Sequence, residues 1–225
     1  MTAAMDSLQY DFESGADLAP VLRSGIERDV RAGVAPPEEV FRRQIELYAH
    51  PLNWARLSPE LGVLFPELVR SEVRAAIARH VQEQEEWGVT DCDRLDMAFA
   101  TLQASGIACF AAADVIPYRR AGGDEREWFE QELRRLPPGE WRAYVYWDEG
   151  HAWRCLKEGA FGLPCRFAAS QGVPPGPPYR DRARVLNEEV AHALERSGVR
   201  YYLGEGGLYV QLQWQRRRPR SDLNW

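Results

Sequence analysis

The sequence predicts an α+β protein in which a helical N-terminal segment precedes a mainly antiparallel sheet with helices on one face. Residues 1–88 show helical periodicity, whereas residues 89–225 alternate helical patterns with short apolar strands. In addition, one helix-then-strand unit occurs twice in the second part. We therefore expect two regions, a helical region at 1–88 and an α+β domain at 89–225.

Three helices are expected in the N-terminal region. The first covers Leu18–Ala32 and ends at Gly33, and the second opens at residues 36–39, where two prolines precede two glutamates. Proline fits the first turn of a helix, and the helix dipole favours carboxylates there. A longer helix runs from Pro66 to about Trp87, with valine or isoleucine at four-residue steps. The segment Pro51–Phe65 is predicted to be an irregular connector.

The second region opens with a capped helix. Thr90 is a typical N-cap, and acidic residues occupy the first turn that follows it. The apolar stripe of this helix consists of Cys92, Leu95, Phe99 and Leu102. Ser105-Gly106 ends the helix, and Ile107–Ala112 is apolar enough for a buried strand. We expect Cys92 to be a buried small hydrophobe rather than a nucleophile.

The middle of this region contains a helix and two strands. The helix is predicted over Glu125–Leu136, and Trp141–Asp148 alternates as a strand does. Its two faces carry Trp141, Ala143, Val145 and Trp147 on one side and Arg142, Tyr144 and Tyr146 on the other. A short helix follows, and Leu163–Ala169 is the second strand candidate.

The last elements are a helix and a hairpin. The helix is expected over Asp181–Ser197, and the hairpin pairs Val199–Leu203 with Leu208–Trp214. Residues 98–107, AFATLQASGI, align without a gap with residues 190–199, VAHALERSGV. In both units a glycine lets the chain reverse at the helix end. The similarity predicts two helices that each pack on the strand that follows.

Composition limits the compartment and the partners. The net charge of -6 argues against a general nucleic-acid binder, because phosphates repel an acidic surface. The N-terminus lacks a basic patch followed by an apolar run, and no stretch reaches the roughly 18 apolar residues of a membrane span. We therefore expect a cytoplasmic protein without membrane association. Its four cysteines form no CxxC pair and should stay reduced.

The stretch Thr90–Phe99 reads TDCDRLDMAF and leads to Gly106-Ile107. It resembles the TDCDRLDxAF motif of an uncharacterised bacterial family, in which the motif precedes a strand. The aromatic strand at 144–147 and the final hairpin with its basic end fit the same outline. The resemblance covers most of the chain, although only TDCDRLDxAF is specific. Because this family is a domain of unknown function, the resemblance implies a fold and a bacterial, cytoplasmic origin, and no activity.

Asp91, Asp93 and Asp96 form the most concentrated polar group on this motif. Carboxylates in the first turn of a helix could hold a hard cation or a basic partner. The simpler interpretation, which we favour, is that Asp91 and Asp93 complement the helix dipole and the cap, while Asp96 pairs with an arginine. No histidine or cysteine pair has the spacing of metal ligands, so neither a metal nor another cofactor is predicted.

Asp148, Glu149 and His151 follow the aromatic strand. A histidine beside carboxylates at a strand end can act as a general base. The sequence Asp-Glu-Gly is also ordinary turn chemistry, and this is the interpretation that we favour.

Strand tyrosines provide the candidate binding surface. Tyr144, Tyr146 and Tyr209, together with Arg142, are expected on strand faces turned away from the helices. Exposed tyrosine and arginine are typical of a protein-binding surface, although they also occur in platforms that stack single-stranded nucleic acid. Alternatively, the N-terminal helical segment covers this face. The basic tail at 216–220 is expected to be solvated.

Two functional classes follow. The leading hypothesis is a non-enzymatic protein that binds a protein partner through the aromatic face, as a regulatory or immunity-type factor. It rests also on the lack of a phosphate-binding glycine loop and of GxSxG and HExxH motifs. The alternative is a hydrolase, with or without a divalent ion, that uses Asp148, Glu149 and His151 or the three aspartates. The sequence makes no prediction of the oligomeric state.

Overall fold

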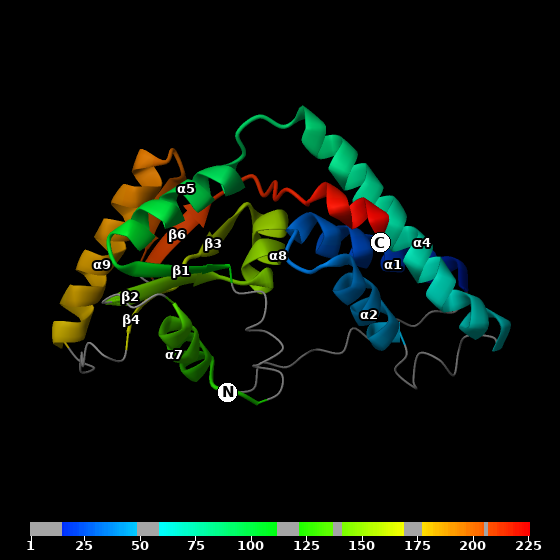
Figure 1. The fold of residues 1–225 in the computed structure, drawn as a ribbon, viewed down its shortest axis with the longest axis horizontal. Coiled ribbons are helices and arrows are strands. Elements are labelled where there is room, and N and C mark those ends of the chain that lie inside the picture. Colours follow the sequence, from blue (N-terminus) through cyan, green and yellow to red (C-terminus); the bar gives the residue numbers. More distant parts are fainter. Residues whose placement is uncertain (1–14, 49–58, 112–121, 137–140, 169–176, 205–206) are drawn as a thin grey trace.

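The computed structural model describes residues 15–48, 59–111, 122–136, 141–168, 177–204 and 207–225. These residues form an α+β fold with helices at the N-terminal end, which confirms the predicted class (Figure 1). None of the described helices is long and apolar enough to cross a bilayer.

The N-terminal helices are α1 (Gly15–Ala32), α2 (Pro37–Tyr48) and α4 (Pro59–Glu83), and we call them the helical layer. Their shared core is apolar and buried, and it includes Leu22, Ile26, Val30, Val40, Phe65, Val69, Val73 and Ile77. Gly33, at φ +68°, ends α1 in the left-handed conformation that glycine adopts without strain.

The predicted start of α4 at Pro66 is wrong, because the helix begins at Pro59 and Pro66 lies inside it. Proline lacks an N–H and therefore removes one bond of the helix. Burial of Phe65 and Val69, which are four residues apart on one face, offsets this loss. The rest of the predicted connector, up to Ser58, falls almost entirely outside the described residues.

The C-terminal part contains two three-stranded sheets instead of one. In the first, the order is β1 (Ile107–Ala111), β2 (Ala143–Trp147) and β4 (Cys165–Phe167), with β1 parallel and β4 antiparallel to β2. In the second, β6 (Gly207–Gln211) lies between β3 (Ala160–Gly162) and β5 (Arg200–Gly204), and all pairs are antiparallel. The predicted hairpin is confirmed as β5–β6.

The strand predicted over Leu163–Ala169 is shorter than expected, because only Cys165–Phe167 form β4. Leu163 still donates its N–H to the carbonyl oxygen of Leu208 at 2.8 Å, in continuation of β3. Pro164 follows and has no N–H to pair. The chain therefore leaves the second sheet at this proline and enters the first sheet as β4.

Helices cover both faces of the first sheet. On one face lie α5 (Asp91–Ala104) and α9 (Pro177–Arg196), the helices of the two similar units. They end at Gly106 and Gly198, with φ of +80° and +75°, and each leads into a strand, β1 or β5, of a different sheet. The other face carries α7 (Glu125–Arg135), whose Phe129 is fully buried.

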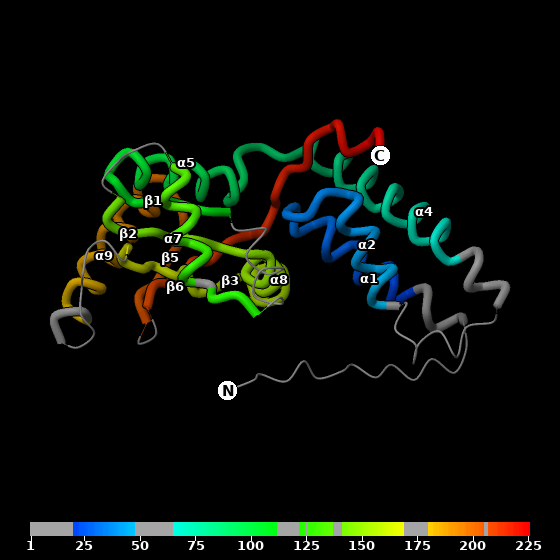
Figure 2. The backbone as a smooth tube through the Cα atoms, turned by 60° about the horizontal axis from the view of Figure 1, so that its bottom comes forward, coloured from blue at the N-terminus to red at the C-terminus, as the bar shows by residue number. Residues whose placement is uncertain are grey.

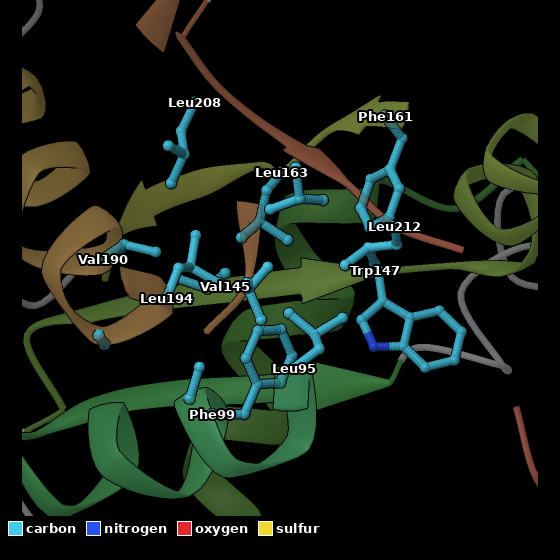
Figure 3. Close-up of a cluster of buried hydrophobic side chains, with 14 of the residues drawn as sticks. Leu95, Phe99, Val145, Trp147, Phe161, Leu163, Val190, Leu194, Leu208 and Leu212 are labelled. Carbon is cyan, nitrogen blue, oxygen red and sulfur yellow. The ribbon is translucent and has the colours of Figure 1, made fainter. Parts of the chain in front are cut away.

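The main core lies between the two sheets and the helices α5 and α9 (Figure 3). Leu95 and Phe99 point from α5, and Val190 and Leu194 point from α9, toward Val145 and the strand residues around it. The inward face of β2 is the one that its alternation predicts, because Ala143, Val145 and Trp147 all belong to this core.

Residues 213–225, which we call the C-terminal strap, cross from β6 to the helical layer (Figure 2). The prediction of a solvated basic tail is therefore wrong. Arg218 has only 4% of its surface exposed, and its guanidinium donates to the carbonyl oxygens of Val30 and Ala35 at 2.9 and 2.7 Å. It also pairs with Asp222 at 2.8 Å, and its backbone N–H donates to Gln84 Oε1.

The strap makes further contacts with the helical layer. Trp214 Nε1 donates to the carbonyl oxygen of Ala32 at 3.1 Å, and Trp225 packs on Phe41 with ring centroids 5.8 Å apart. A second connection runs through α8 (Glu149–Glu158), where the Arg28 guanidinium lies 4.3 Å from the ring centroid of Trp153. The helical layer is thus fastened to the C-terminal part at two places.

We expect Arg218→Met to lower the free energy of unfolding by about 3–5 kcal/mol, because it removes the guanidinium from Asp222 and from the Ala35 carbonyl group. It also removes one of two donors to the Val30 carbonyl group, which accepts from the Gly33 N–H as well. Urea titration followed by circular dichroism measures this change. The matched control is Arg220→Met, which removes an exposed pair with Glu85 and should cost less than about 1 kcal/mol. Equal effects of the two substitutions would contradict the role given to Arg218.

Candidate functional site

Asp148 and His151 form the cap of α8. The Asp148 carboxylate accepts from the His151 N–H at 3.0 Å, and His151 Nδ1 accepts from the Asp148 N–H at 3.1 Å. This reciprocal arrangement satisfies backbone donors at the helix start. The geometry fits the favoured interpretation that these residues have a structural role and are not a general base. They form a helix cap, whereas the sequence indicated a turn.

Glu149 lies between α8 and the helical layer. Its side chain is completely buried, and its Oε1 accepts from Arg43 Nη1 of α2. Arg43 also donates to Glu39 Oε1 at 2.7 Å. Burial opposes the charge of Arg43, but the attraction and hydrogen bonds of Glu149 and Glu39 together outweigh it and raise the arginine pKa. Glu149 therefore connects two parts of the fold and is shielded from solvent.

The three aspartates of the capped helix all contact other groups of the protein. Asp91 accepts from Arg94 at 2.7 Å and from the Gln213 N–H at 2.9 Å. Asp93 accepts from the Thr90 N–H. Burial acts to raise the Asp93 pKa, but the hydrogen bonds with Thr90 and the attraction of Arg217 together lower it. Asp96 pairs with Arg216 at 2.6 Å. Among the described residues, no group of three or more acidic, histidine or cysteine side chains has the geometry of a metal site.

Tyr144 and Tyr146 do not form an open surface. They are 4% and 5% exposed, and their ring centroids lie 4.9 and 4.3 Å from that of Phe129 on α7. The predicted exposed aromatic face is thus wrong for these two residues, and α7 covers them instead of the N-terminal helices. Sequence periodicity places a residue on a face, but it does not show which helix packs there.

Arg142 and Tyr209 have different surroundings. Arg142 pairs with Glu189 of α9 and also donates to the carbonyl oxygen of Ser105. Tyr209 is half-buried, and its ring stacks on that of Tyr202 with centroids 4.9 Å apart and planes within 4°. Tyr209, unlike Arg142, lines an open groove.

This groove, of about 830 Å³, lies between the first half of α9, the β3–β4 connection and the end of the β5–β6 hairpin. We call it the arginine groove. Its polar side chains are Arg166, Arg180, Arg184, Asn187 and Glu188. Leu203, which is 53% exposed, and Tyr209 provide apolar surface beside them.

The charges of the arginine groove are only partly balanced. Glu188, the one carboxylate in its described lining, pairs with Arg184 at 2.9 Å. Among the described residues, Arg166 donates only to the carbonyl oxygen of its neighbour Cys165, at 3.2 Å, and Arg180 contacts no acidic group. The groove therefore carries positive charge beside apolar surface, and guanidinium groups of this kind bind carboxylates or phosphates in a bidentate manner.

A second concave surface of about 380 Å³ lies between the helical layer and α8. Its lining includes Arg31, His80, Glu83, Trp87 and Trp214. His80 Nε2 lies 2.9 Å from the carbonyl oxygen of Arg216 and therefore carries the proton, because that oxygen can only accept. Burial lowers the pKa of His80, so the ring is neutral in the folded protein near pH 7. This histidine is a buried residue of the strap interface.

The cysteines are not activated. Burial raises the pKa of Cys92 and Cys165 to about 12 and that of Cys155 to about 11. It also raises the pKa of Cys109. Because the thiolate is the nucleophilic form, these four thiols are poor nucleophiles at neutral pH. The prediction that Cys92 is a buried hydrophobe is confirmed, since it is 2% exposed.

The protein is thus of α+β class, with an open arginine-lined groove on its second sheet and α9. The chain belongs to the family described as a domain of unknown function (DUF6891), which matches residues 16–218. This match covers both the helical layer and the C-terminal part. No curated protein and no solved structure matches the chain. The bacterial, cytoplasmic origin and the TDCDRLDxAF signature stay predictions.

Sequence reasoning missed the arginine groove. A partial signal was present, because Arg180, directly before the predicted helix, and Arg184 within it are four residues apart. Both belong to α9, where this spacing puts them on one face. Arg166 and Leu203 belong to other elements, and only the packing of α9 against the hairpin brings them to the same groove.

Stability should depend on pH through His80. Its folded pKa lies below the ordinary value of 6.5, so the unfolded chain binds the proton first as the pH falls. The free energy of unfolding should therefore fall from about pH 6.5 downward, through the folded pKa. Urea titrations of the wild type and of His80→Gln, which keeps a donor without titrating, check this. A wild-type curve parallel to that of the variant in this range would contradict it.

Proposed function

We propose that this chain is a non-enzymatic binding protein that holds a protein partner in the arginine groove. The observation that carries this proposal is the juxtaposition of Arg166 and Arg180, which pair with no carboxylate of the described residues, with the exposed side chain of Leu203. Arginine and tyrosine beside apolar surface are the composition of protein interfaces. The proposal keeps the predicted binding role of Tyr209 and moves the binding surface from the predicted aromatic sheet face to this groove.

The hydrolase alternative has less support. Asp148 and His151 form a helix cap, and Glu149 is buried against Arg43, so these groups are not arranged around a common substrate position. The three aspartates are engaged by arginines and backbone donors. None of these residues lines the arginine groove. A general base needs geometric access to the proton that it removes, and a buried ion pair does not provide it.

Nucleic acid is also a weaker candidate than protein. The chain has a net charge of -6, so a polyanion that extends beyond the groove would meet an acidic surface. A protein segment can place a few carboxylates against the arginines without this long-range repulsion. Such a role is compatible with a regulatory or immunity-type factor.

A pull-down from a native lysate of the source cells tests the proposal. The tagged wild type should retain a stoichiometric partner, and Arg180→Glu with Arg184→Glu should reduce its recovery at least about tenfold, since arginines are frequent interface hot spots. The control is Arg126→Glu with Arg134→Glu, an equal change of charge at two exposed positions of α7. It should retain the partner. Absence of any stoichiometric partner, or equal retention by both double variants, would overturn the proposal.

A further inference from the structure

Strand β5 is the outer strand of the second sheet. The order is β3-β6-β5, and β5 pairs only with β6. An outer strand presents backbone donors and acceptors to solvent, and many proteins protect such an edge with charges, proline or a covering element. Here the described residues beside the outer edge of β5 form no backbone hydrogen bond with it.

The register shows which backbone groups are free. In an antiparallel pair, alternate residues direct both their N–H and C=O groups toward the partner strand or away from it. The carbonyl oxygen of Leu208 accepts from Leu163 N–H, on the β3 side, so Leu208 faces away from β5. Leu203 is paired with Leu208, and Tyr201 with Val210, two residues further along. Leu203 and Tyr201 therefore direct their backbone groups outward from the hairpin.

The side chains of β5 give this edge little protection. Tyr202 and Leu203 are 44% and 53% exposed, although both are large and apolar in part. The one charged residue of the strand is Arg200, which is exposed and forms no ion pair with another described residue. All the charge that β5 itself presents to a partner is therefore positive.

The open edge continues into the arginine groove. Leu203 and Gly204 lie on β5 and also line the groove, together with Arg180 and Arg184 of α9. Neighbouring strands of a sheet lie only about 5 Å apart. A strand added beside β5 would therefore pass close to these arginines at one end and Arg200 at the other.

We infer that the bound part of the partner is an extended, acidic segment that adds to β5 as a fourth strand of the second sheet. Backbone hydrogen bonds to Tyr201 and Leu203 provide the attachment, and carboxylates opposite the arginines provide the selectivity. Charge complementarity favours this occupant over a second copy of the chain, because two β5 edges would bring together strands whose only charge is arginine. The inference rests on the proposed function and specifies the partner of the same site.

The probe is a capped, fluorescently labelled peptide of the sequence Glu-Val-Glu-Val-Glu-Val-Glu, with Lys-Val-Lys-Val-Lys-Val-Lys as the control. Fluorescence anisotropy should show saturable binding of the acidic peptide alone. Leu203→Pro removes one outward N–H without touching the bonds to β6, and it should weaken binding about fivefold. Leu203→Ser keeps that N–H and should bind more tightly than Leu203→Pro.

Amide hydrogen exchange of the wild type tests strand addition without requiring any variant to fold. Saturating acidic peptide should slow exchange of the Tyr201 and Leu203 amides at least about tenfold, as new strand hydrogen bonds protect them. The Tyr202 amide, which already faces β6, should change much less. Exchange measured residue by residue with nuclear magnetic resonance distinguishes these sites.

Each negative outcome has a separate meaning. If the acidic peptide binds and the Tyr201 and Leu203 amides exchange as before, strand addition is overturned and the binding role of the groove stands. If the wild type binds no acidic peptide while the lysate partner is retained, the acidic segment is overturned and the proposed function stands. A wild-type dimer in sedimentation analysis that Leu203→Pro dissociates would assign the edge to a second copy and overturn the inference.

Discussion

The buried guanidinium of Arg218 is the contact on which the arrangement of the two parts depends. It reaches the carbonyl groups at the end of α1 and just beyond it, from a strap that starts at β6. A buried charge is stable only when its donors are satisfied, so the positions of Val30, Ala35 and Asp222 are fixed together. At α8, the buried charge of Glu149 is likewise satisfied by an ion pair with Arg43 of the helical layer. Polar contacts therefore decide how the helical layer sits on the apolar core.

Because polar contacts hold the parts of the fold together, several residues that resemble catalytic or metal-binding groups in the sequence have structural roles. Aspartates, a histidine and a glutamate near strand or helix ends serve as caps and ion pairs, and the tyrosines of β2 fill the space under α7. The arginine groove differs, because among the described residues its guanidinium groups exceed its carboxylates and lie beside a strand edge that pairs with no other described strand. Figure 1 places α9 at the opposite end of the molecule from α4, so this site lies away from the strap.

Much of the fold follows from local patterns in the sequence. The cap at Thr90, the glycine ends at Gly106 and Gly198, and the alternation of β2 were all predictable, because short-range sterics and periodicity determine them. The change of sheet at Pro164, the cover of α7 over Tyr144 and the buried position of Arg218 depend on contacts between distant residues. The arginine groove belongs to this second group, and sequence periodicity alone could not assemble it.

In the proposed complex, the arginine groove and the edge of β5 together hold the partner. The hydrogen-exchange footprint of the captured natural partner on the full chain, read by mass spectrometry, tests this arrangement. We expect slower exchange in β5 and in the first half of α9, with no change in α4 or the strap. Protection confined to the surface around His80 and Trp214, with β5 unchanged, would contradict it.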